Sequence, residues 1–389
     1  MKKSLNKNLF LFVVGVFVLV SFVSGVSATP VVNNVDGNFS DGNTITISGI
    51  DFGSEGPNVV IFDDFESGVD GQNINTGSGS AKYGQWGSIN TGAQYSDISA
   101  VSGSLSFMAD EDSYYSCYAE AVLGSVEEVF FSWWQLIPSG TDYPGSNWKP
   151  VWLMGHDTSD DDRYIGTPNP GPYGWIIGSN DNYETAWVDY IGFPIQEGNW
   201  IRGSLYLKEG STGTSDDGIS IFRYINGVNQ GSTTDTNADP LPSDGAWERI
   251  RFNAYTNTNS PNCFPHVDDV YVATGPNAQA RVEIGNNPNY FSSTKLTILT
   301  PTSWNANSIS VTINQGSFSD GEDAYLFVVD ANGDVSGGYS ISFGNISIPT
   351  NCTNPSDTDG NCVITTTEVN AFSTLWKSNS VTIGELINV

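Results

Sequence analysis

Basic residues are scarce in this sequence. Its 389 residues include 14 Lys and Arg against 43 Asp and Glu, and the formal net charge is −29. Proteins bind nucleic acid and anionic membrane surfaces through clustered Lys and Arg. Because the chain has no basic tract, the sequence excludes both kinds of partner. The same charge keeps a chain soluble and favours bound cations.

Residues and motifs of several enzyme classes are also missing. Only two His are present, and no Gly-x-Ser-x-Gly sequence marks a nucleophilic serine. The His and Cys residues do not follow zinc-ligand spacing. The Glu-x-Asp-x-x-Glu strand of laminarinase-type glycosidases, which places two carboxylates on one face, does not occur. These absences argue against serine hydrolases, zinc enzymes and glycosidases of that type.

Long hydrophobic runs are missing beyond the N-terminus. Lys2, Lys3 and Lys7 precede an apolar run over residues 9–23, and small residues follow. This order predicts a signal peptide over residues 1–28 that is removed on export. The run is about 15 residues long, shorter than the ~20 that span a bilayer. We therefore expect a secreted or cell-surface protein with no membrane insertion after the leader is cleaved.

Cysteine is rare as well, with four residues in the chain. In an exported protein these residues are expected to form disulfides. Cys352 and Cys362 are close in sequence and are the favoured pair, which leaves Cys117 and Cys263 to close a long loop. Four cysteines allow three pairings, and the sequence does not choose between them.

β-forming residues dominate from residue 31 to residue 343. Short runs such as 44–47, 129–133 and 310–313 lie between Gly, Asn and Asp turns, and no stretch of this region keeps a helical period. Strands that recur at short spacing are typical of antiparallel sandwiches and jelly rolls. The predicted fold class is therefore all-β.

Four segments of the central section carry a more specific pattern. They are residues 61–66, 199–207, 219–228 and 267–272. A Trp-led strand is followed by a strand that ends in Asn226-Gly227, a pair suited to a tight hairpin turn. Together the segments resemble the opening, middle and closing strands of concanavalin A-like and laminin-G-like domains. The resemblance implies an antiparallel jelly roll over residues 58–279.

The segments on either side of this section share a second pattern. Residues 44–53 resemble the opening of an IPT/TIG immunoglobulin-like domain, and residues 281–285 and 307–313 resemble its later strands. Neither flank has enough strands to close a sandwich alone. We predict one discontinuous Ig-like β-sandwich over residues 29–57 plus 280–344, interrupted by the jelly roll. The alternative is an N-terminal linker strand and a separate C-terminal Ig-like domain.

The last segment, residues 350–389, has the spacing of an EF-hand or dockerin loop. Oxygen ligands fall at the calcium-binding positions of such a loop, and a capped apolar helical pattern follows. Cys362 stands where the loop usually has Gly, and only one repeat is present. The alternative is a solvated acidic turn before a short helix. The predicted calcium ligands are Asp357, Asp359, Asn361, Val363 and Glu368.

Two further acidic pairs lie on the expected first and last strands of the jelly roll. Asp63 with Asp64 and Asp268 with Asp269 would meet where those strands lie side by side. Ca²⁺ takes six to eight oxygen ligands, which two carboxylate pairs and loop carbonyls can supply. We predict a structural calcium with Asp63 and Asp268 among its ligands. The alternative is that acidic residues protect a sheet edge from aggregation.

Aromatic residues are frequent between residues 130 and 190, mostly near Gly, Pro or Asn turns. A pyranose ring stacks its apolar C–H face on an indole or phenol ring, so exposed aromatics in a groove indicate sugar binding. Because Trp is highly buried on average, core packing must claim several of them. The predicted sugar-binding aromatics are Trp148, Trp152, Tyr164, Trp175 and Trp187.

Arginines supply a second indication of sugar binding. Strand alternation places Arg202, Arg249 and Arg251 on outward faces, together with Asn253 and Tyr255. On the concave sheet of a jelly roll these guanidinium groups would hold sugar carboxylates or sulfates. On the convex sheet they would only balance nearby Asp and Glu. The sequence does not say which sheet each strand joins.

One segment holds the residue types of a polysaccharide lyase. Such an enzyme neutralises a uronate and removes its C5 proton with Tyr, His or Lys. His156, Lys149, Arg163 and Tyr164 supply these groups, and alternation puts His156 on the face of Trp152 and Lys149 on the other. The alternative is that His156 ends a strand and Trp152 belongs to the core.

These observations predict a secreted or cell-surface, calcium-stabilised protein that binds a polysaccharide or glycan through its jelly roll. The first alternative is a polysaccharide lyase that acts on an acidic polysaccharide. The second is a non-catalytic surface or adhesion scaffold that attaches to the cell envelope.

Overall fold

The computed structural model describes most of the chain between residues 28 and 344. The described stretches are residues 28–114, 116–140, 148–155, 161–166, 176–181, 187–190, 197–209, 219–235, 247–255 and 262–344, with positions 370, 373 and 374. Residues 1–343 form one compact unit and residues 344–389 a second. Within the second unit, Asn370, Ser373 and Thr374 are helical. No helix among the described residues has the length and apolar composition that crossing a bilayer requires.

Several sequence predictions fall outside the described residues. They concern residues 1–27 of the signal peptide, the calcium-loop ligands Asp357, Asp359, Asn361, Val363 and Glu368, and the cysteines Cys352 and Cys362. The two other cysteines, Cys117 and Cys263, are buried and are not joined in a disulfide.

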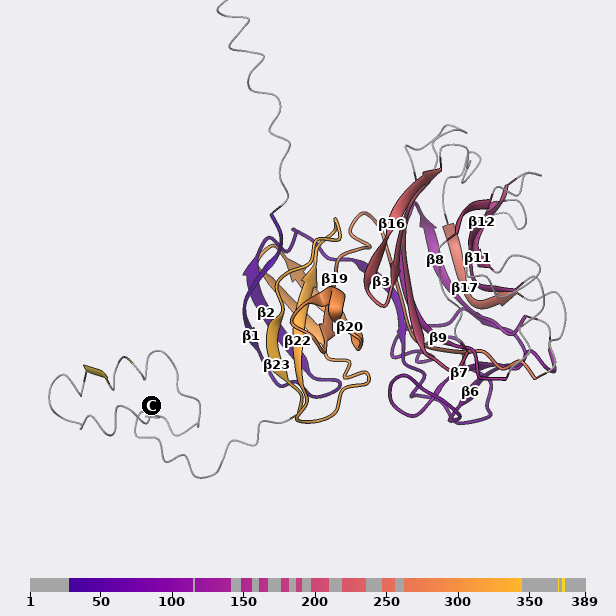
Figure 1. The fold of residues 1–389 in the computed structure, drawn as a ribbon, viewed down its shortest axis with the longest axis horizontal. Coiled ribbons are helices and arrows are strands. Elements are labelled where there is room, and N and C mark those ends of the chain that lie inside the picture. Colours follow the sequence, from indigo (N-terminus) through magenta and orange to yellow (C-terminus); the bar gives the residue numbers. More distant parts are fainter. Residues whose placement is uncertain are drawn as a thin grey trace, which may run out of the picture. The chain divides into compact units, whose positions relative to one another are not determined.

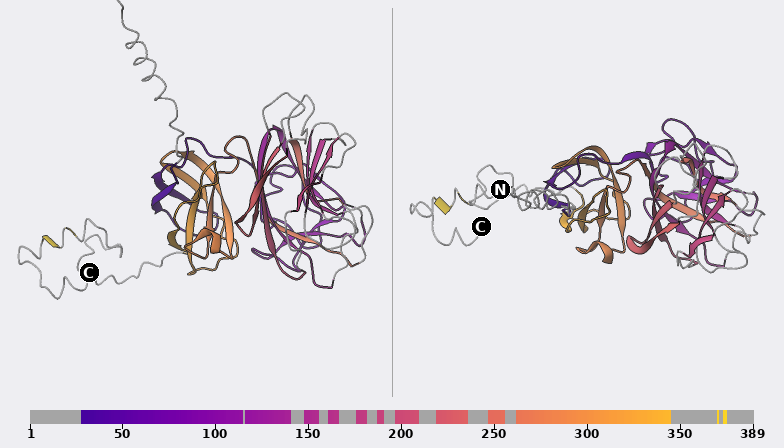
Figure 2. Two further views of the ribbon diagram at one scale, coloured as in Figure 1. Left: turned by 45° about the horizontal axis from the view of Figure 1, so that its top comes forward. Right: turned by 90° about the horizontal axis from the view of Figure 1, so that it is seen from above.

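The fold is all-β, as predicted. Three sheets account for the first unit, and its named strands pair antiparallel throughout the described part. The one helix among residues 28–344 that the structure describes is the 3-10 turn η1 (Tyr290–Ser292). We name the three sheets the flanking sheet, the middle sheet and the front sheet. Figures 1 and 2 show the flanking sheet on one side and the two others packed together.

The flanking sheet combines strands from both ends of the first unit. Its order is β1-β2-β21-β20-β19-β22-β23. Ile45 of β2 lies opposite Val311 of β21, so segments more than two hundred residues apart are neighbours in this sheet. The domain boundaries and the IPT/TIG assignment stay predictions. The strands are β1 (Val31–Asp36), β2 (Thr44–Ile50), β19 (Arg281–Gly285), β20 (Leu296–Asn305), β21 (Ser308–Thr312), β22 (Asp323–Val329) and β23 (Tyr339–Ser342).

The middle sheet has nine strands, with β16-β15-β14-β9-β18-β3-β4 in order and β6 and β7 attached to one side. Asp63 on β3 lies opposite Val270 on β18, so the first and last strands of this section are adjacent. The strands are β3 (Asn58–Asp63), β4 (Tyr83–Gly84), β6 (Ala93–Ser96), β7 (Ser106–Ala109), β9 (Glu128–Leu136), β14 (Ile201–Glu209), β15 (Ile219–Ile225), β16 (Val228–Asp235) and β18 (His266–Thr274).

The front sheet has seven strands in the order β13-β12-β11-β10-β17-β8-β5. The strands are β5 (Ser88–Ile89), β8 (Ala119–Val126), β10 (Lys149–Gly155), β11 (Asp161–Gly166), β12 (Ile176–Asp181), β13 (Trp187–Tyr190) and β17 (Trp247–Tyr255). Alternate residues of these strands enter the core between the front and middle sheets, where Leu153, Ile250 and Phe252 meet Phe131 and Leu205. This packing of two antiparallel sheets is the jelly-roll sandwich that the sequence predicts.

The other face of the middle sheet is also buried. A second apolar cluster joins Phe130, Tyr206 and Tyr271 of the middle sheet to Ile298 of the flanking sheet. Strand β18 is buried along its whole length, as expected for a strand in a sheet that is covered on both faces. The flanking sheet therefore covers the outer face of the middle sheet. It does not cover the outer face of the front sheet, where Val122 is 57% exposed and Arg251 is 22% exposed.

Candidate functional site

The uncovered face of the front sheet brings together residues from three adjacent strands. Trp152 of β10 lies opposite Arg251 of β17, and Arg251 lies opposite Glu120 of β8. Residues that lie opposite each other in antiparallel strands share a face of the sheet. Val151, Leu153, Ile250 and Phe252, which alternate with these residues, belong to the core on the other side. The row from Trp152 to Glu120 therefore faces away from the core.

A cation lies between two aromatic rings at one end of this row. The amine of Lys149 is 4.5 Å from the ring centroid of Tyr255 and 5.3 Å from that of Trp152. The Trp152 and Tyr255 rings meet edge to face, with centroids 5.5 Å apart. Trp152 and Tyr255 are half-buried, whereas Lys149 is 8% exposed. We call these three residues the Lys149 cluster.

The position of Lys149 corrects a sequence expectation. Strict alternation placed Lys149 on the face opposite to Trp152, but its amine contacts the Trp152 ring. The pairing of β10 with β17 shifts between Lys149 and Val151, so alternation does not continue through this point. A bulge of this kind changes the direction of side chains beyond it.

Arg251 continues the same face toward β8. Its Nε donates to Glu120 Oε2 at 2.6 Å, and its guanidinium lies 4.1 Å from the centroid of the Tyr118 ring. The Arg251 side chain is 22% exposed, so the ion pair leaves part of it accessible to solvent. Arg249, half-buried and two residues earlier on the strand, lies opposite Met154 and Val122. The face thus carries Lys149, Arg249 and Arg251 beside three aromatic rings.

Several predicted site residues are described only by their backbone or not at all. The backbone of Tyr164 lies opposite Trp152. On the following strands Gly178 lies opposite Tyr164, and Trp187 lies opposite Gly178. Arg163 lies opposite Leu153. His156 and Trp175 lie outside the described residues.

Trp148 is not available to a sugar. Its side chain is 1% exposed, and its Nε1 donates to Asn253 Oδ1 at 3.1 Å. The sequence placed Trp148 with Trp152 on one face because strand alternation puts residues four positions apart on the same side. In the structure its indole is instead buried next to the start of β10.

Arg202 is also unavailable, although alternation assigned its face correctly. It lies on the outer face of the middle sheet, where the flanking sheet covers it and leaves it 2% exposed. Its Nη1 donates to Glu283 Oε2 of β19 at 2.7 Å, and its Nε donates to Ser132 at 2.9 Å. Arg202 therefore joins two sheets and binds no external carboxylate.

Glu283 accepts from a second buried arginine. Arg281, from the same strand, bonds the other carboxylate oxygen, and Tyr290 donates to that oxygen at 2.9 Å. Burial alone would raise the pKa of Glu283, but the charges of Arg202 and Arg281 outweigh it and hold the pKa at about 2. The carboxylate is therefore ionised at any physiological pH, and it fixes the flanking sheet to the jelly roll.

The predicted calcium site between the first and last strands has a different arrangement. Asp63 accepts from Trp86 Nε1 at 2.7 Å and from Phe65 N, and Asp268 accepts from the backbone of Val101 and Ser102. Among the described residues, no three Asp, Glu, His or Cys side chains are grouped to hold a metal ion. Placed in this way, Asp63 and Asp268 act as hydrogen-bond acceptors rather than as an open ligand set. Calcium stays a prediction.

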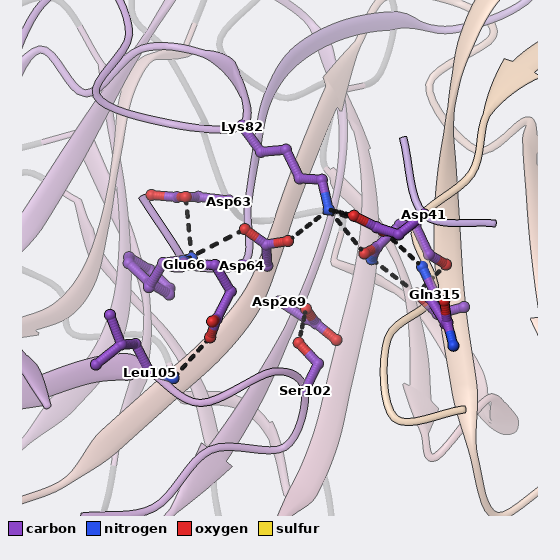
Figure 3. A network of polar contacts seen from close by, with 12 residues as sticks. Asp41, Asp63, Asp64, Glu66, Lys82, Ser102, Leu105, Asp269 and Gln315 are labelled. Carbon is purple, nitrogen blue, oxygen red and sulfur yellow. Dashed lines mark hydrogen bonds and ion pairs between the residues drawn. The ribbon is translucent and has the colours of Figure 1, made fainter. Parts of the chain in front are cut away.

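Burial dominates the chemistry of these carboxyl groups. It raises the pKa of Asp63 and of Asp269 to about 7, and it raises the pKa of Asp268 as well. Ser102 donates its hydroxyl to Asp269 at 2.8 Å, as Figure 3 shows. Protonation near neutral pH therefore limits the negative charge that the first and last strands bring together.

A cleft of about 790 Å³ opens where the flanking sheet meets the jelly roll. Lys82, on the jelly-roll side, donates to Asp64 Oδ2 at 2.7 Å and to Asp41 Oδ1 at 3.2 Å (Figure 3). Asp41 belongs to the β1–β2 loop and also accepts from the backbone of Gln315. Lys82 is thus already paired with two carboxylates. The cleft lies at the contact between the flanking sheet and the jelly roll.

Sequence reasoning missed Glu120 and Tyr118, which complete the Arg251 end of the front face. Alternation over residues 119–126 would have predicted that Glu120 points away from the core, because its neighbours Ala119 and Ala121 point into it. The pairing of Glu120 with Arg251 could not be predicted, because the two residues are 131 positions apart in the sequence.

No family model and no curated protein matches this chain. Solved structures do resemble it, and they include polysaccharide lyases and a carbohydrate-binding domain. A variant of alginate lyase Aly36B with an alginate tetrasaccharide is 12% identical, with 57% of this chain and 98% of that chain covered and a TM-score of 0.40. Domain 4 of the arabinanase AbnA from Geobacillus stearothermophilus, with arabinotriose, is 14% identical over 57% and 94%, with a TM-score of 0.36. An alginate lyase from Aplysia kurodai is 11% identical over 47% and 87%, with a TM-score of 0.35. Similarity at this level carries no conclusion about the chemistry of this chain.

Proposed function

We propose that this protein binds an acidic polysaccharide on the uncovered face of the front sheet. The observation that carries the proposal is the Lys149 cluster, in which an amine lies against two aromatic rings. A cation beside aromatic rings fits a uronate, since the ring stacks on the sugar and the cation meets its carboxylate. Arg251 and Tyr118 repeat this combination on the next strands.

Charge supports an acidic ligand on this face in particular. The whole chain has a net charge of −29, so a polyanion is repelled by most of its surface. Lys149, Arg249 and Arg251 gather three of its 14 basic residues on two adjacent strands. An acidic polymer would therefore meet attraction on the front face and repulsion on most other faces.

Electrophoresis in gels that contain a polysaccharide tests the proposal. We expect retardation by a uronate polymer, with alginate and polygalacturonate as probes, and none by neutral dextran. Trp152→Ala should weaken retardation about tenfold or more, because it removes the central ring of the face. Lys208→Ala is the matched control, since Lys208 is exposed but belongs to the middle sheet. Equal retardation of wild type and Trp152→Ala would contradict this site.

A lyase is the second candidate, and one contact favours it. The Lys149 amine and the Tyr255 phenol ring, two groups that can exchange protons, lie side by side on the proposed face. In a uronate β-elimination a base takes the C5 proton, the C4–O bond breaks, a C4=C5 double bond forms and the leaving oxygen gains a proton. We propose that one of these two groups takes part in such a transfer.

The unsaturated product absorbs in the near ultraviolet, so turnover is followed directly. If the protein is a lyase, Tyr255→Phe should abolish the rise in absorbance and leave retardation almost unchanged, because the ring is kept and the hydroxyl is lost. A wild-type protein that is retarded without any rise in absorbance is a binding protein. A protein that shows neither retardation nor a rise in absorbance would favour the scaffold alternative.

We also propose that the protein is exported and that calcium stabilises it. The leader pattern of residues 1–28 and the ligand spacing from Asp357 to Glu368 support these two proposals. Calorimetric titration with calcium, followed by a chelator, tests the second. Asp357→Asn with Glu368→Gln should remove the heat of binding, and unchanged heat would contradict calcium at the C-terminal loop.

A further inference from the structure

The strand that carries Tyr255 contains an irregularity beside the Lys149 cluster. Lys149 lies opposite Tyr255, and Val151 lies opposite Phe252. Two steps along β10 therefore match three steps along β17, which leaves one extra residue on β17. This arrangement is a β-bulge, and bulges bend a strand and redirect its side chains.

Asn253 supplies the unusual backbone conformation of this bulge. Its φ is 48°, in the left-handed region that few residues other than Gly enter. Asn is among the side chains that tolerate this region. The expected exposed position of Asn253 is wrong, because its side chain is fully buried.

The amide of Asn253 connects three separate segments. Its Nδ2 donates to Glu111 Oε1 at 2.6 Å and to the Cys117 carbonyl at 3.2 Å, and its Oδ1 accepts from Trp148 at 3.1 Å. Glu111 follows β7, Cys117 precedes β8, and Trp148 precedes β10. One buried side chain therefore holds the beginnings of two strands of the front sheet.

These bonds reach the Lys149 cluster through short pieces of backbone. Trp148 is the residue before Lys149, and Tyr255 is two residues after Asn253. Both the cation and one of its rings are thus tethered to Asn253, which is buried and does not reach the face itself. Because Lys149 is 8% exposed, a small shift of either strand would alter the gap between its amine and the rings.

We propose that Asn253, held by Glu111, is the positioning residue of the polysaccharide site. It sets the bulge and the two strand ends so that Lys149 lies between Trp152 and Tyr255. The inference rests on the proposed function of the front face, but its structural half can be tested without any ligand.

Asn253→Gly is the central variant. Glycine keeps the left-handed backbone and removes all three side-chain hydrogen bonds. Asn262→Gly is the matched control, since Asn262 is also left-handed with a φ of 57° but is exposed. With alginate as the probe, and at a temperature where every variant is folded by circular dichroism, Asn253→Gly should lose about tenfold or more in affinity. Asn262→Gly should bind as the wild type does.

Exchange of the two partners tests the Asn253–Glu111 bond itself. At pH 8, above the pKa of Glu111, Asn253→Asp alone places one carboxylate against another and should weaken binding. Addition of Glu111→Gln restores a donor and an acceptor with their positions exchanged. Recovery of at least half of the lost affinity, on a logarithmic scale, is expected. No recovery would overturn the role of this bond.

Chemical labelling separates failure of this inference from failure of the proposed function. Reductive methylation followed by mass spectrometry compares Lys149 with Lys208, an exposed lysine that serves as internal reference. Asn253→Gly should raise the relative labelling rate of Lys149 severalfold, whether or not any polysaccharide binds. An unchanged rate together with unchanged alginate affinity would overturn the inference. A raised rate in a protein that binds no uronate polymer would overturn the proposed function and leave the positioning role in place.

Discussion

The outer faces of the middle and front sheets both carry an arginine on a central strand, and the two arginines have opposite environments. Arg202, on β14, is 2% exposed and bonds the fully buried Glu283. Arg251, on β17, is 22% exposed and bonds Glu120. Both alternate with apolar residues in the same way along their strands. The difference comes entirely from the flanking sheet, which covers one face and not the other.

This contrast separates a structural ion pair from a candidate ligand site. The Arg202–Glu283 pair has no access to water, so loss of one partner leaves a buried charge with fewer counterions. Arg251 keeps contact with solvent, and water replaces much of what its partner supplies. Changes on the middle sheet should therefore act on stability, and changes on the front sheet should act on binding.

The largest effect is expected from Arg202→Met. The change leaves Glu283 with Arg281 as its one charged partner and should lower the free energy of unfolding by about 3–5 kcal/mol. Urea denaturation of the wild type and the variant measures the difference. Folded Arg202→Met should still be retarded by alginate. A loss below about 1 kcal/mol would show that the covered face is not held by this pair.

Two buried carboxyl groups sharpen the comparison through pH. The pKa of Glu283 is about 2 because its arginines outweigh burial, whereas burial raises the pKa of Glu111, behind the front sheet, to about 7. Between pH 4.5 and 7 unfolded chains lose the Glu111 proton while folded chains keep it, so stability falls as pH rises. Glu283 has the opposite sign, and its contribution is lost as pH falls through about 2.

Glu111→Gln removes the pH-dependent contribution of Glu111 to the free energy of unfolding. Relative to the wild type, the variant should gain stability from pH 4.5 to 7 by up to about 3 kcal/mol. Thermal unfolding at several pH values, with Glu55→Gln at an exposed site as control, measures the change. A constant difference between variant and wild type across this range would contradict a raised pKa of Glu111.

A smaller effect on stability, with a clear effect on binding, is expected from Arg251→Met. Loss of its pair with Glu120, whose side chain is 7% exposed, should cost about 1–3 kcal/mol, less than loss of Arg202. Affinity for alginate should fall about tenfold, because a charge-assisted contact to a carboxylate is lost. The two quantities are measured by urea denaturation and gel retardation. A large loss of stability with unchanged retardation would assign Arg251 to the structural class of Arg202.

The smallest effect is expected from Lys208→Ala. Lys208 lies on β14, six residues after Arg202, and forms an ion pair with Glu128. The Lys208 side chain is 52% exposed. Its loss should change the free energy of unfolding by less than about 0.5 kcal/mol. Comparison with Arg202→Met on the same strand, by the same urea titration, then isolates the effect of the covering sheet. Equal losses for both variants would contradict it.

Much of the architecture was predictable from local pattern. Alternation of apolar and polar residues identified the strands and their core faces, as for Ile250 and Phe252, because the side-chain period of a strand is two. It also assigned Arg202 and Arg251 to outward faces. It failed at Lys149, where the bulge at Asn253 breaks the period.

The candidate site was less predictable than the fold. Trp152 and Arg251 were expected on a sugar-binding face, but their pairing joins residues about a hundred positions apart, and strand order decides it. Trp148 was expected beside them and is buried instead. No local signal distinguishes an indole that stacks on a ligand from one that fills the space below a strand end.

By itself, the sequence determined the all-β class, the faces of most strands and the kinds of side chain available for a ligand, because these depend on neighbours along the chain. Only the tertiary structure decided which outward face stays open to solvent. That choice depends on where the flanking sheet packs, and burial there converts Arg202 from a surface cation into one half of an ion pair. The same alternating pattern therefore has two outcomes, and contacts between distant strands select between them.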